Sequence, residues 1–140
     1  MGFCMSMRGD GMIYLLVGFG GIIGASLRFS LGIWTNSYWT GSLPLATVLA
    51  NLTGSFLLGW LTEYAVQTKK LPSHFTAAVG TGLIGSFTTF STFSFENIQL
   101  MMDSKWETAF VYTFVSLIGG FLFVSFGCAL GRKAACRKEH

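Results

Sequence analysis

The sequence contains few charged residues and few of the side chains on which catalysis or metal binding usually depends. Charged residues make up 11% of the chain, and there are only two histidines, two prolines and three cysteines. The two histidines leave almost no material for a histidine metal site or a catalytic dyad. The cysteines, at positions 4, 128 and 136, follow no metal-ligand spacing, and their odd number leaves no complete disulfide framework. An enzyme that works through histidine is therefore disfavoured.

Apolar residues dominate the rest of the chain, and they predict an integral membrane protein. Of the 140 residues, 51% are hydrophobic, and the mean hydropathy is +0.57. Four apolar stretches, at about 12–34, 44–65, 73–97 and 108–130, each reach the ~20 residues that a membrane-crossing helix needs. Because the connections are short and the stretches show no internal repeat, we predict one all-α membrane domain, 1–140, with four transmembrane helices.

The third stretch contains a segment, Gly80 to Phe95, that is too polar for an ordinary helix surrounded by lipid. It begins with glycines and continues with serines, threonines and phenylalanines. We predict that this helix is broken near its middle, between Gly82 and Thr88, with hydroxyl groups bonding to the backbone groups that the break sets free. Freed carbonyl groups are also suitable ligands for a hard cation such as Na⁺.

Two stripes of polar or small residues recur every four positions, so each stripe follows one face of a helix. In the second stretch the stripe consists of Thr47, Asn51 and Ser55. In the fourth stretch it consists of Tyr112, Ser116 and Gly120. An asparagine amide inside the bilayer needs polar partners, and either hydrogen bonds between helices or ligand binding would supply them. A membrane serine can also simply bond to the carbonyl four residues earlier.

These patterns favour the passage of an ion over catalysis. Phe90 and Phe93 are three residues apart, so they project from one helix face, either as core packing or as ring edges for an anion. Gly20 and Gly24 form a small-xxx-small pair, which favours association with another helix. The only charge in the first stretch is Arg28, which tells against a small proton-coupled exporter with a carboxylate there. Such an exporter and a non-transporting membrane assembly protein are the alternatives.

The segment Gly-Ser-Phe-Thr-Thr-Phe-Ser-Thr-Phe at 85–93 closely resembles the signature of the Fluc, or CrcB, family of fluoride channels. Supporting matches are Gly-Ala-Ser-Leu-Arg at 24–28 and Asn-Leu-Thr-Gly-Ser-Phe at 51–56, so the resemblance covers nearly the whole chain. It implies a channel in the cell (plasma) membrane that passively exports fluoride and lowers its cytoplasmic concentration. It also implies an antiparallel, dual-topology dimer with two fluoride pathways and a central structural sodium ion.

The resemblance further implies which residues line the fluoride pathway. Phe90 and Phe93 would present their ring edges to the ion, and Asn51 would donate its amide. Tyr112 and Ser116 would continue the polar track on the fourth helix. These roles make the two stripes and the phenylalanine pair parts of one pathway.

Other residues receive supporting roles from the same resemblance. The carbonyl groups of Gly85 and Thr88, supplied by both subunits, would hold the sodium ion. Thr47 and Glu96 would lie toward the vestibules at the mouths of the pathway, with Thr47 also counted as a pathway residue. Arg28 would anchor the first helix near the membrane surface.

Two departures from the family pattern and the distribution of basic residues complicate the resemblance. Ser86 stands where many relatives continue the glycine run, and Gly120 stands where some carry a serine. Basic residues at 8, 69, 70, 132, 133, 137 and 138 share the side of the termini, whereas Lys105 alone lies in the opposite loops, with Arg28 nearby. The positive-inside rule then favours one orientation with cytoplasmic termini, so a paired homologue of opposite orientation is an alternative to a homodimer.

Overall fold

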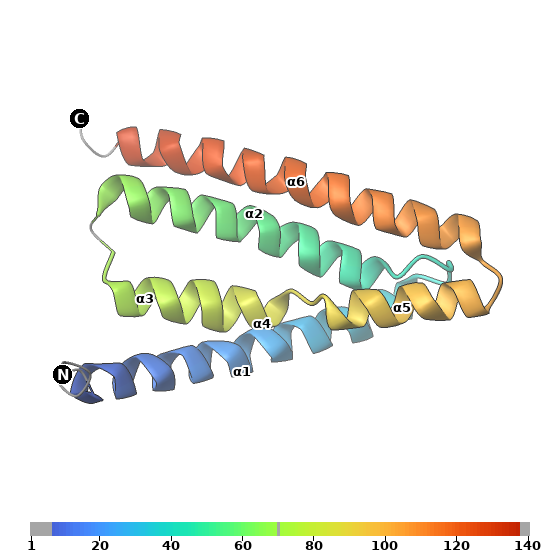
Figure 1. The fold of residues 1–140 in the computed structure, drawn as a ribbon, viewed down its shortest axis with the longest axis horizontal. Coiled ribbons are helices and arrows are strands. Elements are labelled where there is room, and N and C mark those ends of the chain that lie inside the picture. The colour runs from blue at the N-terminus through green and yellow to red at the C-terminus, as the bar shows by residue number, and fades with distance from the viewer. Residues whose placement is uncertain (1–6, 70, 138–140) are drawn as a thin grey trace, which may run out of the picture.

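The computed structural model describes residues 7–69 and 71–137, and its secondary structure in these ranges is entirely helical (Figure 1). The elements are α1 (Met7–Tyr38), α2 (Leu45–Thr68), α3 (Ser73–Ala77), the π-helix η1 (Ala78–Ile84), α4 (Gly85–Phe87), α5 (Ser91–Met102) and α6 (Trp106–Cys136). No strand occurs in the part of the chain that is described, and the prediction of an all-α protein is confirmed.

Within the described ranges, three helical segments are long and apolar enough to cross a membrane. They are Gly11–Tyr38 in α1, Leu45–Thr68 and Trp106–Cys136, and they contain most or all of the first, second and fourth predicted stretches. The third stretch runs instead as two shorter pieces, 73–87 and 91–102, that follow one another alongside the long helices (Figure 1). Since neither piece could cross a bilayer alone, the fourth transmembrane helix stays a prediction.

The helix α1 ends four residues later than the sequence predicted, at Tyr38 instead of position 34. Two hydroxyl groups in this last turn bond to backbone carbonyls of the same helix. Thr35 Oγ1 donates to the Leu31 carbonyl at 2.7 Å, and Ser37 Oγ donates to the Ile33 carbonyl at 3.0 Å. The helix thus satisfies these hydroxyl groups itself. Residues 35–38, which were predicted to follow the helix, are therefore part of it.

The break in the third stretch lies further along the chain than predicted. The glycine-rich residues remain helical, because η1 continues directly into α4. The chain leaves the helix only at Thr88, whose backbone is extended (φ −77°, ψ 158°), and α5 begins at Ser91. The prediction that the third helix is broken near its middle is therefore confirmed, but the break coincides with the predicted range, Gly82 to Thr88, only at its last residue.

The glycines of this segment serve close packing against α1. A Cβ atom on Gly82 would lie 2.5 Å from the Val17 carbonyl oxygen, and Cβ atoms on Gly20 and Gly24 would collide with backbone carbonyls of η1. Two helix backbones can approach this closely only where side chains are absent. The predicted helix contact at Gly20 and Gly24 is thus confirmed, and its partner is the glycine-rich helix itself.

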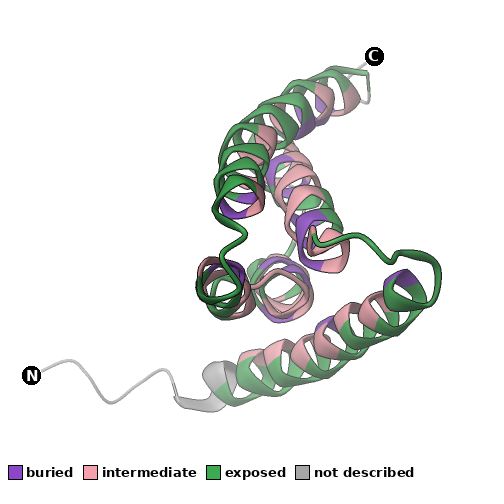
Figure 2. Ribbon diagram, turned by 90° about the vertical axis from the view of Figure 1, so that its right-hand side faces the viewer, coloured by how far each residue is buried: buried purple, intermediate pink, exposed green. Residues whose placement is uncertain are grey.

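A second close pair consists of α2 and α6, which lie side by side over most of their length (Figure 1). A Cβ atom on Gly59 would lie 2.6 Å from the Val124 carbonyl oxygen, and one on Gly131 would lie 2.8 Å from the Trp60 carbonyl oxygen. Figure 2 shows that the buried positions of these helices face their neighbours, whereas exposed residues cover their outer surface. The bundle is therefore built from two helix pairs, α1 with η1 and α4, and α2 with α6.

The start of α1, the α2–α3 connection and the end of α6 lie at one end of the bundle (Figure 1). The described basic residues of this end are Lys69, Arg132, Lys133 and Arg137. Side chains at 8, 70 and 138, which the predicted charge asymmetry also included, lie outside the described residues. Lys105, in the α5–α6 connection, lies at the opposite end. The described residues thus preserve the excess of basic charge at the end where α1 begins and α6 ends.

Candidate functional site

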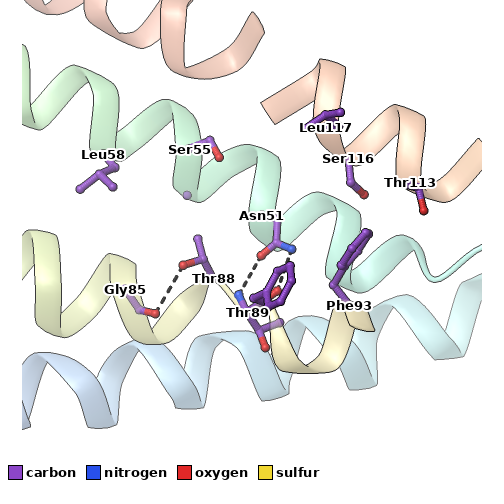
Figure 3. Close-up of a pocket in the computed structure, with 12 residues that line it drawn as sticks. Asn51, Ser55, Leu58, Gly85, Thr88, Thr89, Phe93, Thr113, Ser116 and Leu117 are labelled. Carbon is purple, nitrogen blue, oxygen red and sulfur yellow. Dashed lines mark hydrogen bonds between the residues drawn. The ribbon is translucent and has the colours of Figure 1, made fainter. Parts of the chain in front are cut away.

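The side chain of Asn51 reaches the break between α4 and α5 from α2 and forms hydrogen bonds with its backbone (Figure 3). Asn51 Oδ1 accepts a hydrogen bond from the Thr89 N–H at 2.8 Å, and Asn51 Nδ2 donates to the Thr89 carbonyl at 2.9 Å. The Thr89 N–H would otherwise donate to the Gly85 carbonyl and continue the helix. An amide side chain therefore replaces the backbone partners that Thr89 loses at the break.

Thr89 also bonds to the first turn of the next helix. Its Oγ1 accepts a hydrogen bond from the Thr92 N–H at 3.2 Å, which is the geometry of an N-cap, and donates to Thr92 Oγ1 at 3.0 Å. Sequence reasoning did not single out Thr89. The signal that could have identified it is a threonine placed three residues before another hydroxyl residue, at the start of an apolar helix.

The break opens onto a cavity of about 620 Å³ between α2, α5 and α6. Its lining residues are Asn51, Gly54, Ser55, Leu58, Gly85, Thr88, Thr89, Phe90, Phe93, Thr113, Ser116 and Leu117. Six of the predicted site residues are brought together here: Asn51, Gly85, Thr88, Phe90, Phe93 and Ser116. Figure 3 labels all of them except Phe90. Residues from α2, α4, α5 and α6 thus meet around one polar break.

Ser116 presents a hydroxyl group to this cavity without any hydrogen-bond partner. Its Oγ atom is buried, and no other buried side-chain nitrogen or oxygen in the described residues lacks a partner. The alternative of a bond from Ser116 to the carbonyl four residues earlier is not realised in the structure. A buried hydroxyl without a partner costs free energy, so its presence beside a cavity indicates a place for a polar ligand or water.

The rings of Phe90 and Phe93 are neighbours, as their spacing predicted. Their centroids are 6.0 Å apart, and the Phe93 ring is also 4.9 Å from the ring of Tyr112. Phe90 is 80% exposed, whereas Tyr112 is fully buried. The three rings therefore lead from the open side of the cavity into the interior between α5 and α6.

Glu96 connects this interior to the end of the bundle. Tyr112 Oη donates to Glu96 Oε2 at 2.7 Å, and Thr47 Oγ1 donates to Glu96 Oε1 at 3.0 Å. Glu96 also lines a second cavity, of about 300 Å³, beside the α1–α2 and α5–α6 connections. The Glu96 carboxylate thus accepts a hydrogen bond from both hydroxyl groups. Thr47 and Glu96 were expected from the sequence to lie toward the vestibules, but this network was not predicted.

A second polar contact between α5 and α6 was missed from the sequence. Asn97 is 7% exposed, its Nδ2 donates to the Phe93 carbonyl at 3.1 Å, and its Oδ1 accepts from Thr113 Oγ1 at 3.1 Å. The only sequence signal is an asparagine and a threonine inside apolar stretches. Because the two residues are far apart in the chain, no spacing rule pairs them.

The remaining predicted residues lie outside this constellation. Arg28 is partly exposed on α1 and forms no ion pair with any described carboxylate. Ser86 faces α1, because a Cβ atom on Gly21 would lie 3.2 Å from Ser86 Oγ. Gly120 faces α2, where a Cβ atom on it would lie 3.8 Å from Ser55 Oγ. Neither departure from the family pattern therefore creates a steric conflict.

Backbone carbonyl oxygens at the break are candidate cation ligands. The described residues contain no cluster of three histidine, cysteine, aspartate or glutamate side chains that could hold a metal. The Gly85 carbonyl, deprived of the Thr89 N–H, receives only a long 3.4 Å bond from Thr88 Oγ1. Weakly bonded carbonyl oxygens fit a hard monovalent cation, although one chain offers too few of them to complete its coordination.

Comparison with known proteins places this chain among relatives that are named for one ion. A fluoride-specific ion channel, FluC 1, of Bacillus cereus is 49% identical over 120 residues, covering 86% of this chain and 88% of the relative. FluC 2 of Listeria monocytogenes, also named a fluoride-specific ion channel, is 38% identical over 129 residues, covering 92% and 98%. FluC 2 of Moorella thermoacetica, with the same description, is 41% identical over 116 residues, covering 83% and 93%.

The sequence profile described as CrcB-like protein, Camphor Resistance (CrcB), matches residues 15–128. This range begins in α1 and ends in α6, so it contains the break, both helix pairs and every predicted site residue. This match covers far more than half of the chain. The alignments with the three relatives also cover nearly the whole length of each relative. The chain therefore belongs to the CrcB family.

Proposed function

We propose that this protein is a fluoride channel of the cell membrane that lets fluoride leave the cytoplasm passively. It is a channel and not an enzyme. The observation that carries the proposal is the helix break beside Asn51, which opens onto a cavity containing the unpaired Ser116 hydroxyl. A dehydrated anion needs hydrogen-bond donors at the depth of the bilayer, and this cavity offers them without a histidine or lysine among its lining residues.

The two helix ends at the break favour the binding of ions of opposite sign. The α4 end presents carbonyl groups with partial negative charge, whereas the N-terminus of the 12-residue α5 presents N–H groups with partial positive charge. Asn51 Nδ2 uses one of its two protons for Thr89 and keeps the other for a ligand. Together with the positive edges of Phe90 and Phe93, these groups suit a small anion.

The path toward the bundle end passes the Tyr112 hydroxyl. In the present conformation Tyr112 and Thr47 donate to Glu96, so neither proton is directed at an ion. Fluoride moving from Ser116 toward the second cavity would therefore require these hydroxyl groups to turn away from the carboxylate. On this proposal Thr47, Tyr112 and Ser116 are successive donors, and Glu96 controls when two of them are available.

A sodium ion fits the proposal as a structural element. The Gly85 carbonyl is exposed and weakly bonded, and the Thr88 carbonyl follows at the extended residue of the break. Sodium bound there would supply positive charge next to the anion path. A second chain would have to contribute the same two carbonyls, because two oxygens do not satisfy the cation.

The open shape of the cavity also supports a dimer. The cavity is open on the side where Phe90 is exposed, so a single chain leaves the anion path without a wall. An antiparallel second chain would provide that wall and would create two equivalent paths. The excess of basic residues at one end favours a fixed orientation, so a homologue with reversed charge bias is an alternative to an identical chain as the partner.

Fluoride efflux from liposomes that contain the purified protein tests the function. We expect wild-type protein to release fluoride when the membrane potential is clamped with a potassium ionophore. Phe90→Ile should reduce this efflux, whereas Phe95→Ile, a matched exposed position on α5, should leave it near the wild-type rate.

Other results would favour other functions. Absence of fluoride efflux from correctly folded wild-type protein would reject the channel and leave a membrane assembly protein, whose variants would change association only. Transport driven by a pH gradient without fluoride would favour a proton-coupled exporter. If both phenylalanine variants behaved like wild type, the channel would stand and the assignment of Phe90 would be rejected.

A further inference from the structure

The hydroxyl stripe of α6 is interrupted at Gly120, and Ser55 of α2 faces the gap. The stripe consists of Tyr112 and Ser116, followed one turn later by Gly120, which has no side chain to donate. A Cβ atom built on Gly120 would find Ser55 Oγ at 3.8 Å, an ordinary van der Waals distance. The Ser55 hydroxyl group therefore lies next to the space that a side chain at position 120 would occupy.

The Ser55 hydroxyl is available to a ligand. It lines the same cavity as Ser116, and it forms no hydrogen bond within the described residues. Other helical hydroxyl groups bond to the carbonyl four residues earlier, as Thr53 does to Leu49 at 2.6 Å and Ser125 does to Phe121 at 2.8 Å. The two cavity serines lack this bond, so both retain a free donor.

We infer that Ser55 donates a hydrogen bond to the permeating anion and takes over the step that Gly120 cannot provide. This inference rests on the proposed channel function. Asn51 stands one helical turn before Ser55, and Ser116 faces the same space from α6, so three donors from two helices surround one part of the cavity. The polar track thus crosses from α6 to α2 instead of continuing along α6.

Fluoride efflux of Ser55→Ala is the direct test, with Ser125→Ala as the matched control. Ser125 lies on α6 and bonds only to its own helix. We expect Ser55→Ala to lower the efflux rate about tenfold, as for the loss of one hydrogen bond to a charged partner, and Ser125→Ala to change it little. Ser55→Thr keeps the hydroxyl group and should retain most of the efflux.

A second substitution distinguishes a donor from a packing residue. Gly120→Ser in the Ser55→Ala background should restore efflux, since position 120 has room for a Cβ atom, whereas Gly120→Ala in that background should not. Equal efflux of Ser55→Ala and Ser125→Ala, or failure of Gly120→Ser to rescue, overturns the inference while leaving the channel intact. Absence of wild-type efflux would instead reject the proposed function and the inference together. Size-exclusion elution identical to wild type confirms that each variant is folded.

Discussion

Replacing Asn51 tests whether one side chain from α2 creates the helix break. Asn51→Leu preserves the approximate size of the residue and removes both hydrogen bonds to Thr89. Hydrogen bonds between membrane helices contribute about 0.6 to 1.7 kcal/mol each, and an unpaired buried backbone group costs about 1 to 3 kcal/mol. Two bonds lost at one residue should therefore lower the free energy of unfolding by about 2 to 4 kcal/mol.

Asn51→Asp separates the structural role of this residue from its role toward the anion. The carboxylate still accepts the Thr89 N–H, but it cannot donate to the Thr89 carbonyl. We expect about half of the stability loss of the leucine variant, since one of the two bonds survives. Fluoride efflux should nevertheless fall at least as far, because a negative charge would replace the only amide donor in the cavity.

Unfolding of the detergent-solubilised protein, followed by tryptophan fluorescence, measures the first effect, and liposome efflux measures the second. Thr53→Val is a suitable control because its hydroxyl bonds only within α2 and its side chain is exposed. The reasoning would be refuted if Asn51→Leu unfolded within about 0.5 kcal/mol of the control, the usual range for surface substitutions. In that case the break would persist without the amide.

Three further substitutions test other contacts. Gly59→Ala would place a Cβ atom 2.6 Å from the Val124 carbonyl oxygen, so α2 and α6 must separate, and we expect a loss of about 1 to 3 kcal/mol in unfolding experiments. Thr113→Val removes the hydroxyl proton that Asn97 accepts and should cost about 1 kcal/mol, whereas Thr113→Ser should cost less. Glu96→Gln leaves one of the two hydroxyl donors, Thr47 or Tyr112, without an acceptor oxygen. The expected loss in the free energy of unfolding is about 1 kcal/mol, which corresponds to a melting temperature lower by a few degrees in a chain of this size. Unchanged unfolding of any of these variants would show that its contact contributes nothing measurable.

Local patterns in the sequence predicted much of the architecture. The apolar stretches became helices, and Gly20 with Gly24 became a helix contact. The spacing of Phe90 and Phe93 correctly predicted neighbouring rings. These predictions succeeded because each depends on residues within two turns of one helix, where the geometry is fixed by the helical repeat.

Predictions that depended on distant residues failed or could not be made. The break was predicted to begin among the glycines, but contact with α1 keeps those residues helical. The chain leaves the helix where Asn51 binds Thr89, a pairing across 38 positions. Likewise, the partners of Glu96 come from two other helices, and only the folded bundle defines them.

The pairing of α2 with segments made later has a consequence for biosynthesis. Thr89 follows its partner Asn51 by 38 residues, and Cys128 follows its partner Gly59 by 69 residues. At about 5 to 20 residues per second, the amide of Asn51 waits about 2 to 8 seconds for its partner. An asparagine without partners in lipid is unfavourable. We therefore expect α2 to stay beside the insertion machinery, or against another polar segment, until the third stretch has emerged from the ribosome.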